Sequence, residues 1–346
     1  MKTLGVLTGG GDCPGLNAVI RAVERAGIPY DFETLGIRNG WQGLIDGDVE
    51  SLTDHTVSGI LPKGGTILGT SRTNPLKKTG DIQKIKANIK KYGIHALVVI
   101  GGDGTLSAAR DLAKQGIFLV GIPKTIDNDI SGTDVTFGFD TAVSTVTEAI
   151  DRLHTTAESH HRIMVVEVMG RNVGWIAVMA GIAGGADEIL IPEVPFTMNG
   201  VCAKLKNRYD AGKKFSIVVI AEGVHEMDLG MPSVPENQRD ECGHEKFVGV
   251  GNRLGKELER RLGIETRVTI LGHVQRGGSP TAYDRILATR FGVAAVQLVH
   301  ASDFGKMVAL QGNRITGIPL ETAVNQLKTV DNEFYELAMT VIGGRK

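Results

Sequence analysis

The residues best suited to chemistry lie in two short segments that combine glycine with acidic side chains. The first reads Gly-Gly-Asp-Gly-Thr over residues 101–105, after an apolar run over 96–100 and before a helical pattern over 107–114. Backbone N–H groups in such a loop can converge on a phosphate, with the helix dipole behind them. The carboxylate of Asp103 is then placed to hold Mg²⁺ against phosphate oxygens. A tight turn capped by an aspartate is the alternative for this segment taken alone.

The second segment reads Pro-Lys-Thr-Ile-Asp-Asn-Asp over residues 123–129 and follows an apolar run over 118–122. It carries two carboxylates, an amide, a hydroxyl and an ammonium. Acids two residues apart in an extended or turn segment can do different jobs. One can accept the proton of an attacking hydroxyl while the other is held by backbone or by metal-bound water. A surface Asx-turn is the alternative interpretation, and the proximity of the Gly101 loop argues against it.

Two common nucleotide-binding motifs are absent from the sequence. No G-x-x-x-x-G-K-[ST] segment occurs, so a P-loop enzyme is excluded. The glycines that begin at Gly9 do not form G-x-G-x-x-G, because Pro14 stands where the third glycine should be. A dinucleotide-dependent dehydrogenase is therefore disfavoured.

The elements that should position these segments are apolar, β-branched runs that end abruptly in glycine or small polar residues before a helical pattern. Because they are apolar on both faces, they predict mainly parallel strands covered by helices. In open sheets of this kind, ligands bind outside the carboxyl ends of the strands, so these ends should line one cleft. After the fifth run, Ser279 and Pro280 predict the start of another helix. The five runs cover residues 4–7, 96–100, 163–168, 217–221 and 268–271.

Composition narrows the class of protein. With 346 residues, 42% of them hydrophobic, the chain can bury the cores of two domains. The net charge of -1 gives no reason to expect nucleic acid or an anionic membrane as partner. Cys13, Cys202 and Cys242 lack metal-ligand spacing and suggest a reducing compartment. The sequence has no secretory h-region or membrane-length apolar run, so we expect a cytoplasmic protein.

Five motifs together resemble the successive signatures of the 6-phosphofructokinase family, and the combination of Gly104 with Lys124 resembles its mixed-substrate subgroup that uses ATP. Gly-Gly-Asp-Gly-Thr alone is shared with NAD kinases and lipid kinases. All five in this order, within a resemblance that covers residues 3 to about 315, are specific. The motifs occupy residues 10–12, 101–105, 125–129, 169–171 and 272–278.

This resemblance implies Mg²⁺-dependent phosphorylation of fructose 6-phosphate at its 1-hydroxyl by ATP, a committing step of glycolysis. Asp127 would take the proton of the hydroxyl, Thr125 would hydrogen-bond the transferring phosphoryl group, and Arg171 would be a further catalytic residue. Asp103 would be the Mg²⁺ ligand, with Asp129 close to the metal. The residues implied on the nucleotide side are Gly10, Gly11, Arg72, Thr73, Gly102, Asp103, Gly104 and Thr105.

The resemblance also implies a site for the sugar phosphate. Two of its arginines, Arg162 and Arg267, would come from the neighbouring subunit, so a homo-oligomer, either a dimer or a tetramer, would be part of the mechanism. The residues implied in substrate binding are Thr125, Asp127, Asp129, Arg162, Met169, Gly170, Arg171, Glu222, Arg267, His273 and Arg276.

Two positions bear on the phosphoryl donor. With lysine at position 124, the sequence resembles the pyrophosphate-dependent members of the family. The well-known ATP-dependent bacterial enzymes usually have glycine there. Gly104 points the other way, because pyrophosphate users typically carry an aspartate that repels or blocks the α-phosphate of a nucleotide. A direct block on nucleotide entry weighs more, so we expect ATP, with pyrophosphate as the alternative donor.

The family's bacterial effector site is matched only in part. Arg21, Arg25 and Lys213 agree with it, whereas Asp54 and His154 stand where basic residues are usual. An acid and a mostly neutral imidazole weaken the binding of a phosphorylated effector. Regulation through this site is therefore not expected.

The expected fold is α/β, with two similar lobes, each a mainly parallel sheet flanked by helices, and the active site in the cleft between them. We expect a nucleotide- and Mg-binding lobe over residues 1–140, to which the chain returns over about 255–310. A sugar-phosphate-binding lobe should cover residues 141–254. Residues 311–346 form a C-terminal segment without an assigned place, and 225–247 should be a surface excursion.

Two other classes of function remain as alternatives. A sugar-phosphate-binding protein without catalysis could use the same sheets and loops. Against it stand Asp103, Asp127 and Asp129, since three acids beside bound phosphates are unfavourable unless a metal and a proton transfer need them. An NAD kinase-like enzyme would explain the Gly101 loop but would leave Glu222 and residues 273–278 without a task.

Overall fold

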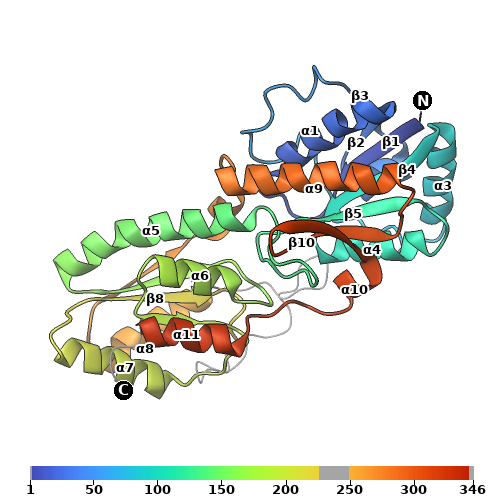
Figure 1. Cartoon of the computed structure of the whole chain (residues 1–346). Coiled ribbons are helices and arrows are strands. Elements are labelled where there is room, and N and C mark those ends of the chain that lie inside the picture. The colour runs from blue at the N-terminus through green and yellow to red at the C-terminus, as the bar shows by residue number, and fades with distance from the viewer. Residues whose placement is uncertain (1, 226–248, 343–346) are drawn as a thin grey trace. The chain divides into compact units, whose positions relative to one another are not determined.

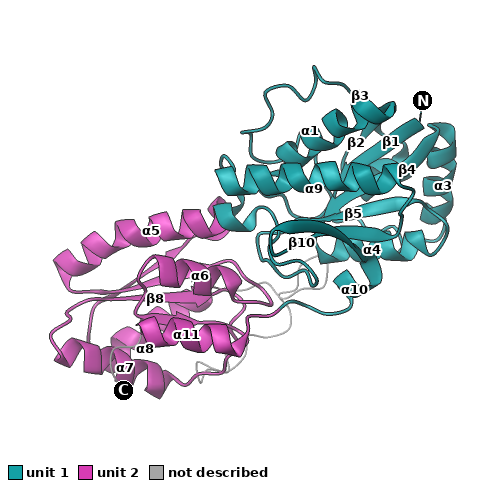
Figure 2. Cartoon of the chain, in the orientation of Figure 1, with its two compact units in different colours: residues 1–141, 276–328 teal, residues 142–275, 329–346 magenta. Residues whose placement is uncertain are grey.

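The computed structural model of the chain describes residues 2–225 and 249–342 (Figure 1). The chain divides into two compact units, which Figure 2 shows in different colours. Unit 1 comprises residues 1–141 and 276–328, and unit 2 comprises residues 142–275 and 329–346. Each unit contains its own β-sheet. The expected α/β class, with two sheet-based lobes, is confirmed.

Unit 1 is built on a seven-stranded sheet with the order β11-β10-β5-β4-β1-β2-β3. The inner strands are parallel, and β3 and β11 pair antiparallel at the two edges. Leu4, Val6 and Leu7 of β1 are fully buried on both faces, as expected for a strand covered by helices on either side. The strands are β1 (Lys2–Thr8), β2 (Phe32–Ile37), β3 (Val49–Leu52), β4 (Ile94–Gly101), β5 (Leu119–Pro123), β10 (Lys306–Gln311) and β11 (Arg314–Pro319).

Helices cover both faces of this sheet. On one face, Trp41, Ile85 and Leu106 from three helices join Leu97 and Met307 of the sheet in one buried cluster. On the other, α1 and α9 pack against each other, and α9 also contacts β4, β5 and β10 (Figure 1). The helical elements are α1 (Leu16–Gly27), η1 (Ile28–Tyr30), α2 (Trp41–Asp46), α3 (Asp81–Lys91), α4 (Asp103–Ala113), α9 (Ala282–His300) and α10 (Leu320–Val324).

Unit 2 is built on a four-stranded, all-parallel sheet with the order β7-β8-β6-β9. Every residue of β6 and β8 is buried. Helix α5 begins at the end of the first segment of unit 1 and continues into unit 2. The elements are α5 (Phe139–His160), β6 (Ile163–Val168), α6 (Trp175–Ala183), β7 (Glu188–Leu190), α7 (Met198–Asp210), β8 (Ser216–Ala221), α8 (Val250–Leu262), β9 (Thr266–Ile270), η3 (Gly272–Arg276) and α11 (Asn332–Ile342).

The five apolar runs of the sequence are all strands, namely β1, β4, β6, β8 and β9, with ends that differ by a few residues from those expected. The first two belong to unit 1 and the other three to unit 2. The helix expected over residues 107–114 begins earlier, at Asp103, because Gly102 ends the strand with extended backbone and serves as N-cap. The helix expected after Ser279 begins instead at Ala282, since the hydroxyl of Thr281 accepts from the N–H of Asp284 and caps α9.

The division into units differs from the expected boundaries at two places. The chain returns to unit 1 at Arg276 rather than near residue 255, because β9 pairs with β6 and α8 packs on both strands. The C-terminal segment is shared, with residues 311–328 in unit 1 and 329–346 in unit 2. The excursion expected over 225–247 lies outside the described residues, apart from His225.

The sequence also predicts that the cysteines are free thiols and that no segment is long and apolar enough to span a membrane. Cys13 is buried, which raises the pKa of its thiol to about 12 and keeps it protonated. Cys13 and Cys202 are free thiols, and Cys242 lies outside the described residues. In the part of the chain that the structure describes, no helix combines the length and the apolar character needed to cross a bilayer.

Candidate active site

Two glycine-rich loops lie side by side at the carboxyl ends of β1 and β4, which are neighbours in the sheet of unit 1. The N–H of Gly9 donates to the carbonyl of Ile100 at 2.9 Å. Thr105, in the first turn of α4, fills the space between the loops. A Cβ on Gly9 would lie 2.7 Å from Thr105 Oγ1, and one on Gly101 would lie 2.4 Å from Thr105 Cβ. These glycines are required because a larger residue would separate the two loops.

The segment around Arg72 and Thr73 lies against the first loop. Gly10 donates its N–H to the carbonyl of Ser71 at 2.9 Å, and the hydroxyl of Thr70 donates to the carbonyl of Gly10 at 2.6 Å. Thr73 is held by Gln42, whose side-chain oxygen accepts from its hydroxyl at 3.1 Å. Three chain segments expected on the nucleotide side, residues 10–11, 72–73 and 102–105, are thus brought together in unit 1.

Position 104 is open. A Cβ on Gly104 would meet no atom within 4 Å, in contrast to the crowded glycines beside it. Gly104 follows Asp103 in the first turn of α4, where backbone N–H groups are not used within the helix. This helix end therefore has both free space and the positive end of the helix dipole, which suit a phosphate group.

The third loop follows β5, the next strand of the sheet, and carries the acidic residues. Lys124 donates its backbone N–H to the carbonyl of Gly101 at 3.0 Å, so this loop lies directly beside the Gly101 loop. Asp127 donates its N–H to the hydroxyl of Thr125 at 3.0 Å. Asn128 adopts the left-handed conformation with φ 56°, which turns the chain between the two acids. Thr125, Asp127 and Asp129 are therefore held in one tight turn.

The carboxylates of this loop influence one another. Burial raises the pKa of Asp129, and the charge of Asp127 raises it further, with a smaller contribution from Asp103. Burial also raises the pKa of Asp103, which Arg110 partly opposes. The Oδ1 atom of Asp129 is buried and accepts no hydrogen bond. An unpaired, buried carboxylate oxygen close to two other acids is the arrangement expected where a cation belongs.

These acids fit a magnesium ion better than a metal held by protein alone. In the described residues, no three or more side chains of His, Cys, Asp or Glu come together as a metal cage. Mg²⁺ usually keeps several waters and is bound through one or two carboxylates and the phosphates of a substrate. Asp103, with Asp129 close by, would suit this kind of binding.

Two cationic side chains gather around Gly11. Lys124 is buried, with 3% of its surface exposed, and its ammonium donates to the carbonyl of Gly11. Burial lowers the pKa of Lys124. A Cβ on Gly11 would lie 1.8 Å from Nη1 of Arg276, so only glycine allows this guanidinium to approach. Arg276, which the sequence analysis assigns to the sugar phosphate, thus lies in unit 1 beside the loop assigned to the nucleotide.

Within unit 2, the remaining substrate residues other than Arg162 and Arg267 lie at the carboxyl ends of β6, β8 and β9. Glu222 donates its backbone N–H to the carbonyl of Val168 at 2.8 Å, and a Cβ on Gly223 would lie 1.9 Å from the carbonyl oxygen of Arg171. Gly170 has φ 136°, a conformation that L side chains rarely adopt. Met169, Gly170, Arg171 and Glu222 therefore form one group, because β6 and β8 are adjacent.

A buried glutamine joins His273 to that group and was not assigned a role from the sequence. Gln275 is fully buried in η3; its side-chain oxygen accepts from the N–H of Met169 at 3.2 Å, and its amide donates to Gly272 at 3.0 Å. The segment of His273 is thereby fixed beside Met169. The sequence offered one signal, namely that Gln275 lies in the motif over residues 272–278. That it fixes this motif beside Met169 is visible only from their hydrogen bond.

Arg162 and Arg267 lie at the opposite end of the same sheet. Arg162 immediately precedes β6 and Arg267 is the second residue of β9, whereas Met169 follows the end of β6. A strand of this length separates its two ends by roughly 20 Å. Both arginines pair with Glu265, Arg162 at 2.8 Å. Within one chain, unit 2 therefore does not bring these arginines to the group around Met169 and Glu222.

Two of the residues expected at the effector site neutralise each other. Nε of Arg25 lies 2.7 Å from a carboxylate oxygen of Asp54. His154 hydrogen-bonds through Nε2 to the carbonyl of Gly184 at 2.7 Å. Asp54 and His154 thus each have a polar partner within the chain.

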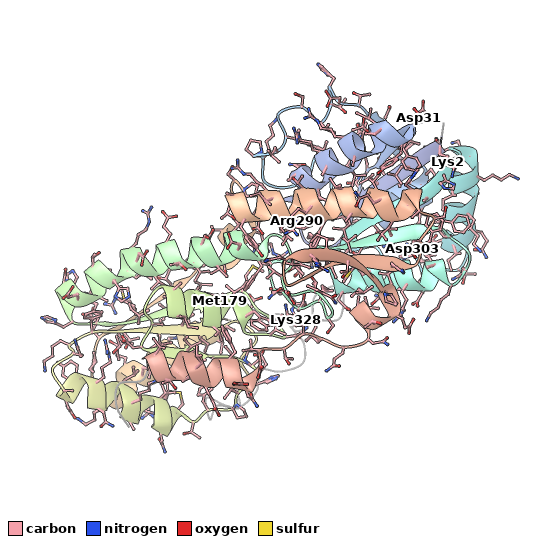
Figure 3. All side chains as sticks on the ribbon, in the orientation of Figure 1. Lys2, Asp31, Met179, Arg290, Asp303 and Lys328 are labelled. Atoms are coloured by element: carbon pink, nitrogen blue, oxygen red, sulfur yellow. The ribbon has the colours of Figure 1, made fainter. Side chains whose placement is uncertain are left out.

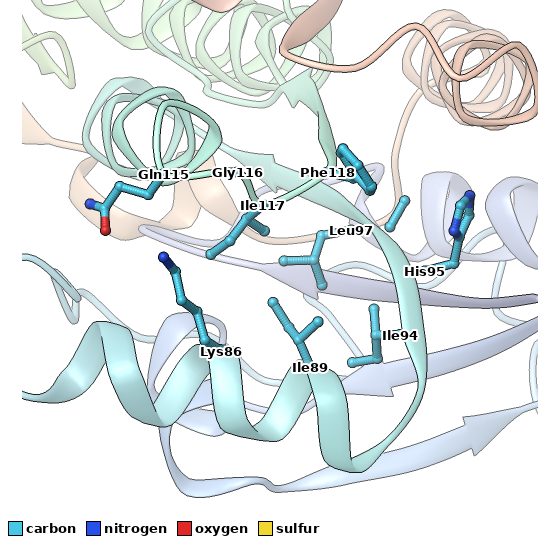
Figure 4. A pocket seen from close by; sticks show the side chains of 10 residues that line it. Lys86, Ile89, Ile94, His95, Leu97, Gln115, Gly116, Ile117 and Phe118 are labelled. Atoms are coloured by element: carbon cyan, nitrogen blue, oxygen red, sulfur yellow. The ribbon is translucent and has the colours of Figure 1, made fainter.

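The pocket in Figure 4 is not part of this site. It has a volume of about 510 Å³ and is lined by Ile94, Leu97, Ile117 and Phe118, with Lys86 and Gln115 also at its wall. Among its lining residues, some come from the amino end of β4 and others from the segment that precedes β5. Asp103 and the glycine loops lie at the carboxyl ends of β4 and its neighbour β1.

Glycine loops, a helix N-terminus and a cluster of acidic residues at the carboxyl ends of parallel strands define an α/β protein that handles phosphate groups. The family model described as "Phosphofructokinase" matches residues 3–299. The chain belongs to the phosphofructokinase family, as the five motifs indicated.

Individual relatives differ in the donor that their names state. A Streptomyces coelicolor protein named pyrophosphate–fructose 6-phosphate 1-phosphotransferase is 56% identical over 96% of this chain and 97% of its own length. Another from the same organism, ATP-dependent 6-phosphofructokinase 3, is 53% identical over 98% of this chain and 99% of its own. The solved structure of Pichia pastoris phosphofructokinase matches with a TM-score of 0.83 and 34% identity. That match covers 98% of this chain, which spans only 36% of the yeast chain.

Proposed function

We propose that this protein transfers a phosphoryl group from Mg-ATP to the 1-hydroxyl of fructose 6-phosphate, in glycolysis in the cytoplasm. The observation that carries the proposal is the group of Asp103, Asp127 and Asp129 beside two glycine loops. Such a group is unfavourable in a protein that only binds phosphates, because each carboxylate repels them. It is useful where a cation is bound and a hydroxyl must lose its proton.

The acidic and hydroxyl side chains of the loop after β5, together with Asp103 and two arginines, have separate tasks in this reaction. Asp127 accepts the proton of the sugar hydroxyl as its oxygen attacks the γ-phosphorus of ATP, while the bond from that phosphorus to the bridging oxygen breaks and ADP leaves. Thr125 hydrogen-bonds the transferring phosphoryl group, while Asp103 and Asp129 would hold Mg²⁺. When bound, this ion offsets charge on the phosphate oxygens of the donor. Arg72 and Arg171 supply fixed positive charge to the phosphoryl oxygens, whose charge is spread out in a loose transition state.

The open position at Gly104 supports ATP as the donor. A nucleotide needs room beyond the two phosphates that pyrophosphate also has, and the first turn of α4 leaves that room. Lys124 does not oppose this, because its ammonium is buried and bonded to the carbonyl of Gly11. It holds the first glycine loop in place, a task that either donor requires. Pyrophosphate is the second candidate donor, favoured by the name of the 56% identical relative.

The sugar phosphate is bound by the group in unit 2. Glu222 is suited to a sugar hydroxyl, and His273 to the 6-phosphate. Arg162 and Arg267, at the far end of that sheet, are proposed to serve the site of a neighbouring subunit. A homo-oligomer, dimer or tetramer, is then required for a complete site.

Formation of fructose 1,6-bisphosphate from fructose 6-phosphate tests the proposal, with ATP and pyrophosphate supplied in parallel and with Mg²⁺ present or removed by EDTA. We expect Mg²⁺-dependent turnover with ATP. Turnover with pyrophosphate alone would assign the donor to the second candidate. Absence of turnover with both, together with measurable sugar-phosphate binding, would favour the binding protein. NAD phosphorylation would favour the NAD kinase-like alternative.

A further inference from the structure

The last residues of unit 1 lie against the acidic loop that follows β5. The backbone N–H of Lys328 donates to the carbonyl of Asp129 at 3.0 Å. Ile130 and Leu327 form an isolated antiparallel bridge, and the hydroxyl of Ser131 donates to the carbonyl of Gln326 at 2.7 Å. Residues 326–328, about which the sequence motifs say nothing, therefore run alongside the loop that carries the proposed base.

The side chain of Lys328 binds the same turn. Its ammonium donates to Oδ1 of Asn128 and to the carbonyl of Thr133, both at 3.1 Å, and also to the carbonyl of Asp134. Figure 3 labels Lys328 on the structure. An ammonium has three protons to donate, and three oxygens from one short stretch of chain accept them. Lys328 therefore ties residues 128–134 to the C-terminal segment.

Asn128 is the point through which this contact reaches the acids. It is left-handed, with φ 56°, and its Oδ1 also accepts the N–H of Thr136 at 3.1 Å. The hydroxyl of Thr136 in turn donates to the carbonyl of Thr125 at 2.7 Å. Asparagine adopts the left-handed conformation more readily than other residues with a Cβ, and hydrogen bonds to its side chain stabilise that conformation. Two donors, one neutral and one cationic, thus hold the amide of Asn128, and the cationic bond is the stronger kind.

We propose that Lys328 is a positioning residue, which fixes the left-handed turn at Asn128 and thereby the direction of Asp127. This rests on the proposed function, in which Asp127 is the base. Phosphoryl transfer depends on alignment, and a displacement of about 1 Å can lower the rate about 100-fold. Loss of the ammonium leaves Asn128 with one donor, so the turn should stay folded but become less well defined.

The experiment compares Lys328→Met with Lys114→Met in steady-state kinetics. Lys114 pairs with Glu321 at 2.7 Å, so it also ties the C-terminal segment to unit 1 but touches no acid of the loop. We expect kcat of Lys328→Met to fall by about 10- to 100-fold, with KM for fructose 6-phosphate within threefold of wild type. Lys114→Met should keep the wild-type kcat. A kcat of Lys328→Met within twofold of wild type would overturn the proposal.

Two further measurements separate positioning from general stability. In an Asn128→Gly background, where glycine still allows the left-handed turn, Lys328→Met should lower kcat by less than threefold. If Lys328→Met lowered kcat as much in the Asn128→Gly background as in the wild type, Lys328 would not act through Asn128. Hydrogen exchange of the ligand-free protein should be faster at the amides of Asp127 and Thr136 in Lys328→Met, and unchanged exchange would contradict the proposal.

The exchange measurement does not depend on turnover. If the wild type did not phosphorylate fructose 6-phosphate, faster exchange in Lys328→Met would still establish that Lys328 holds the loop, while the proposed function would fail. If Lys328→Met does not fold, Lys328→Gln replaces it. Glutamine keeps an amide donor but loses the charge, so kcat should fall by less than about 10-fold, while the amides of Asp127 and Thr136 should still exchange faster than in the wild type; unchanged exchange would contradict the proposal.

Discussion

Asp127 and Asp129 are two residues apart, and their surroundings give them different tasks. Asp129 is half-buried beside two other acids and has a buried oxygen without a hydrogen-bond donor, which suits a cation. Asp127 is bonded through its backbone to the hydroxyl of Thr125, the residue proposed to contact the transferring group. Proton acceptance is therefore assigned to Asp127, and charge balance to Asp129 and Asp103.

Replacing the base should separate catalysis from binding. We expect Asp127→Ser to lower kcat by at least about 10² to 10⁴, the range typical of a general base. KM for fructose 6-phosphate should change little, because Asp127 is not among the residues proposed to bind the 6-phosphate. Steady-state kinetics with fructose 6-phosphate as the varied substrate measures both, and Asp303→Asn, a surface acid paired with Lys306, is the control. A nearly normal kcat would remove Asp127 from this role.

The donor should depend on the charge at position 104. Two like charges about 5 Å apart repel by about 3 kcal/mol at an effective dielectric constant of 20, so Gly104→Asp should lower kcat/KM for ATP at least tenfold. Pyrophosphate, which has no α-phosphate linked to a nucleoside, should be less affected. The matched control is Gly104→Asn, which has the same size without the charge. Unchanged use of ATP by Gly104→Asp would contradict this account of donor choice.

At the scale of elements, one buried acid joins the N-termini of α5 and α9. Asp284 has no exposed surface and accepts the backbone N–H of Thr141 at 2.8 Å as well as the hydroxyl of Thr141. Thr281, the N-cap of α9, donates to Asp140 at 2.6 Å. Burial raises the pKa of Asp284 to about 6, although the hydrogen bonds from Thr141 partly oppose it.

This raised pKa predicts a pH-dependent stability of unit 1. The pKa in the folded state lies above the unfolded value near 4, so the contribution of Asp284 is complete below about pH 4. It is lost as the pH rises through about 6. Two pKa units correspond to about 3 kcal/mol. Relative to Asp284→Asn, the wild type should therefore lose stability by an amount of this order between pH 4 and pH 7.

Urea unfolding followed by tryptophan fluorescence can measure this difference. Trp41 lies in unit 1 and Trp175 in unit 2, so a Trp175→Phe background leaves Trp41 as the reporter of unit 1. The control is Asp303→Asn at the surface, which should follow the wild type across this range. Parallel pH profiles for wild type and Asp284→Asn would show that the buried carboxyl does not carry this dependence.

At the scale of the whole molecule, the placement of Arg162 and Arg267 makes subunit association part of the proposed mechanism. Both lie at the amino end of the sheet of unit 2, roughly 20 Å along β6 from Met169. Their shared acid, Glu265, keeps both guanidinium groups together at that end. A site that uses them and Glu222 must therefore draw on two chains.

Mixing two inactive variants tests this sharing. Asp127→Ser and Arg162→Ala should each have low activity, and an equal mixture that is unfolded and refolded together should regain about a quarter of wild-type activity. In a symmetric dimer interface, half of the dimers are mixed and one of their two sites receives both intact residues. The two variants assayed together without exchange of subunits are the control. No recovery after verified exchange would place all residues of a site in one chain.

The sequence by itself determined the local chemistry of this protein and most of its framework. The glycine loops, the acids after β5 and the five strand ends follow from residue type and spacing over a few positions, because backbone conformation and burial pattern are local properties. The family also followed from the sequence, since the motifs over residues 10–278 had the right order and the family model matches residues 3–299.

Only the tertiary structure decided which distant segments meet. Lys328 contacts Asn128 across 200 positions, Gln275 reaches Met169 across 106, and Arg276 lies against Gly11 within unit 1. Strand order also set the return to unit 1 at Arg276, because β9 pairs with β6. Such contacts depend on which strands become neighbours and which helices cover them, and no local pattern of residues contains that information.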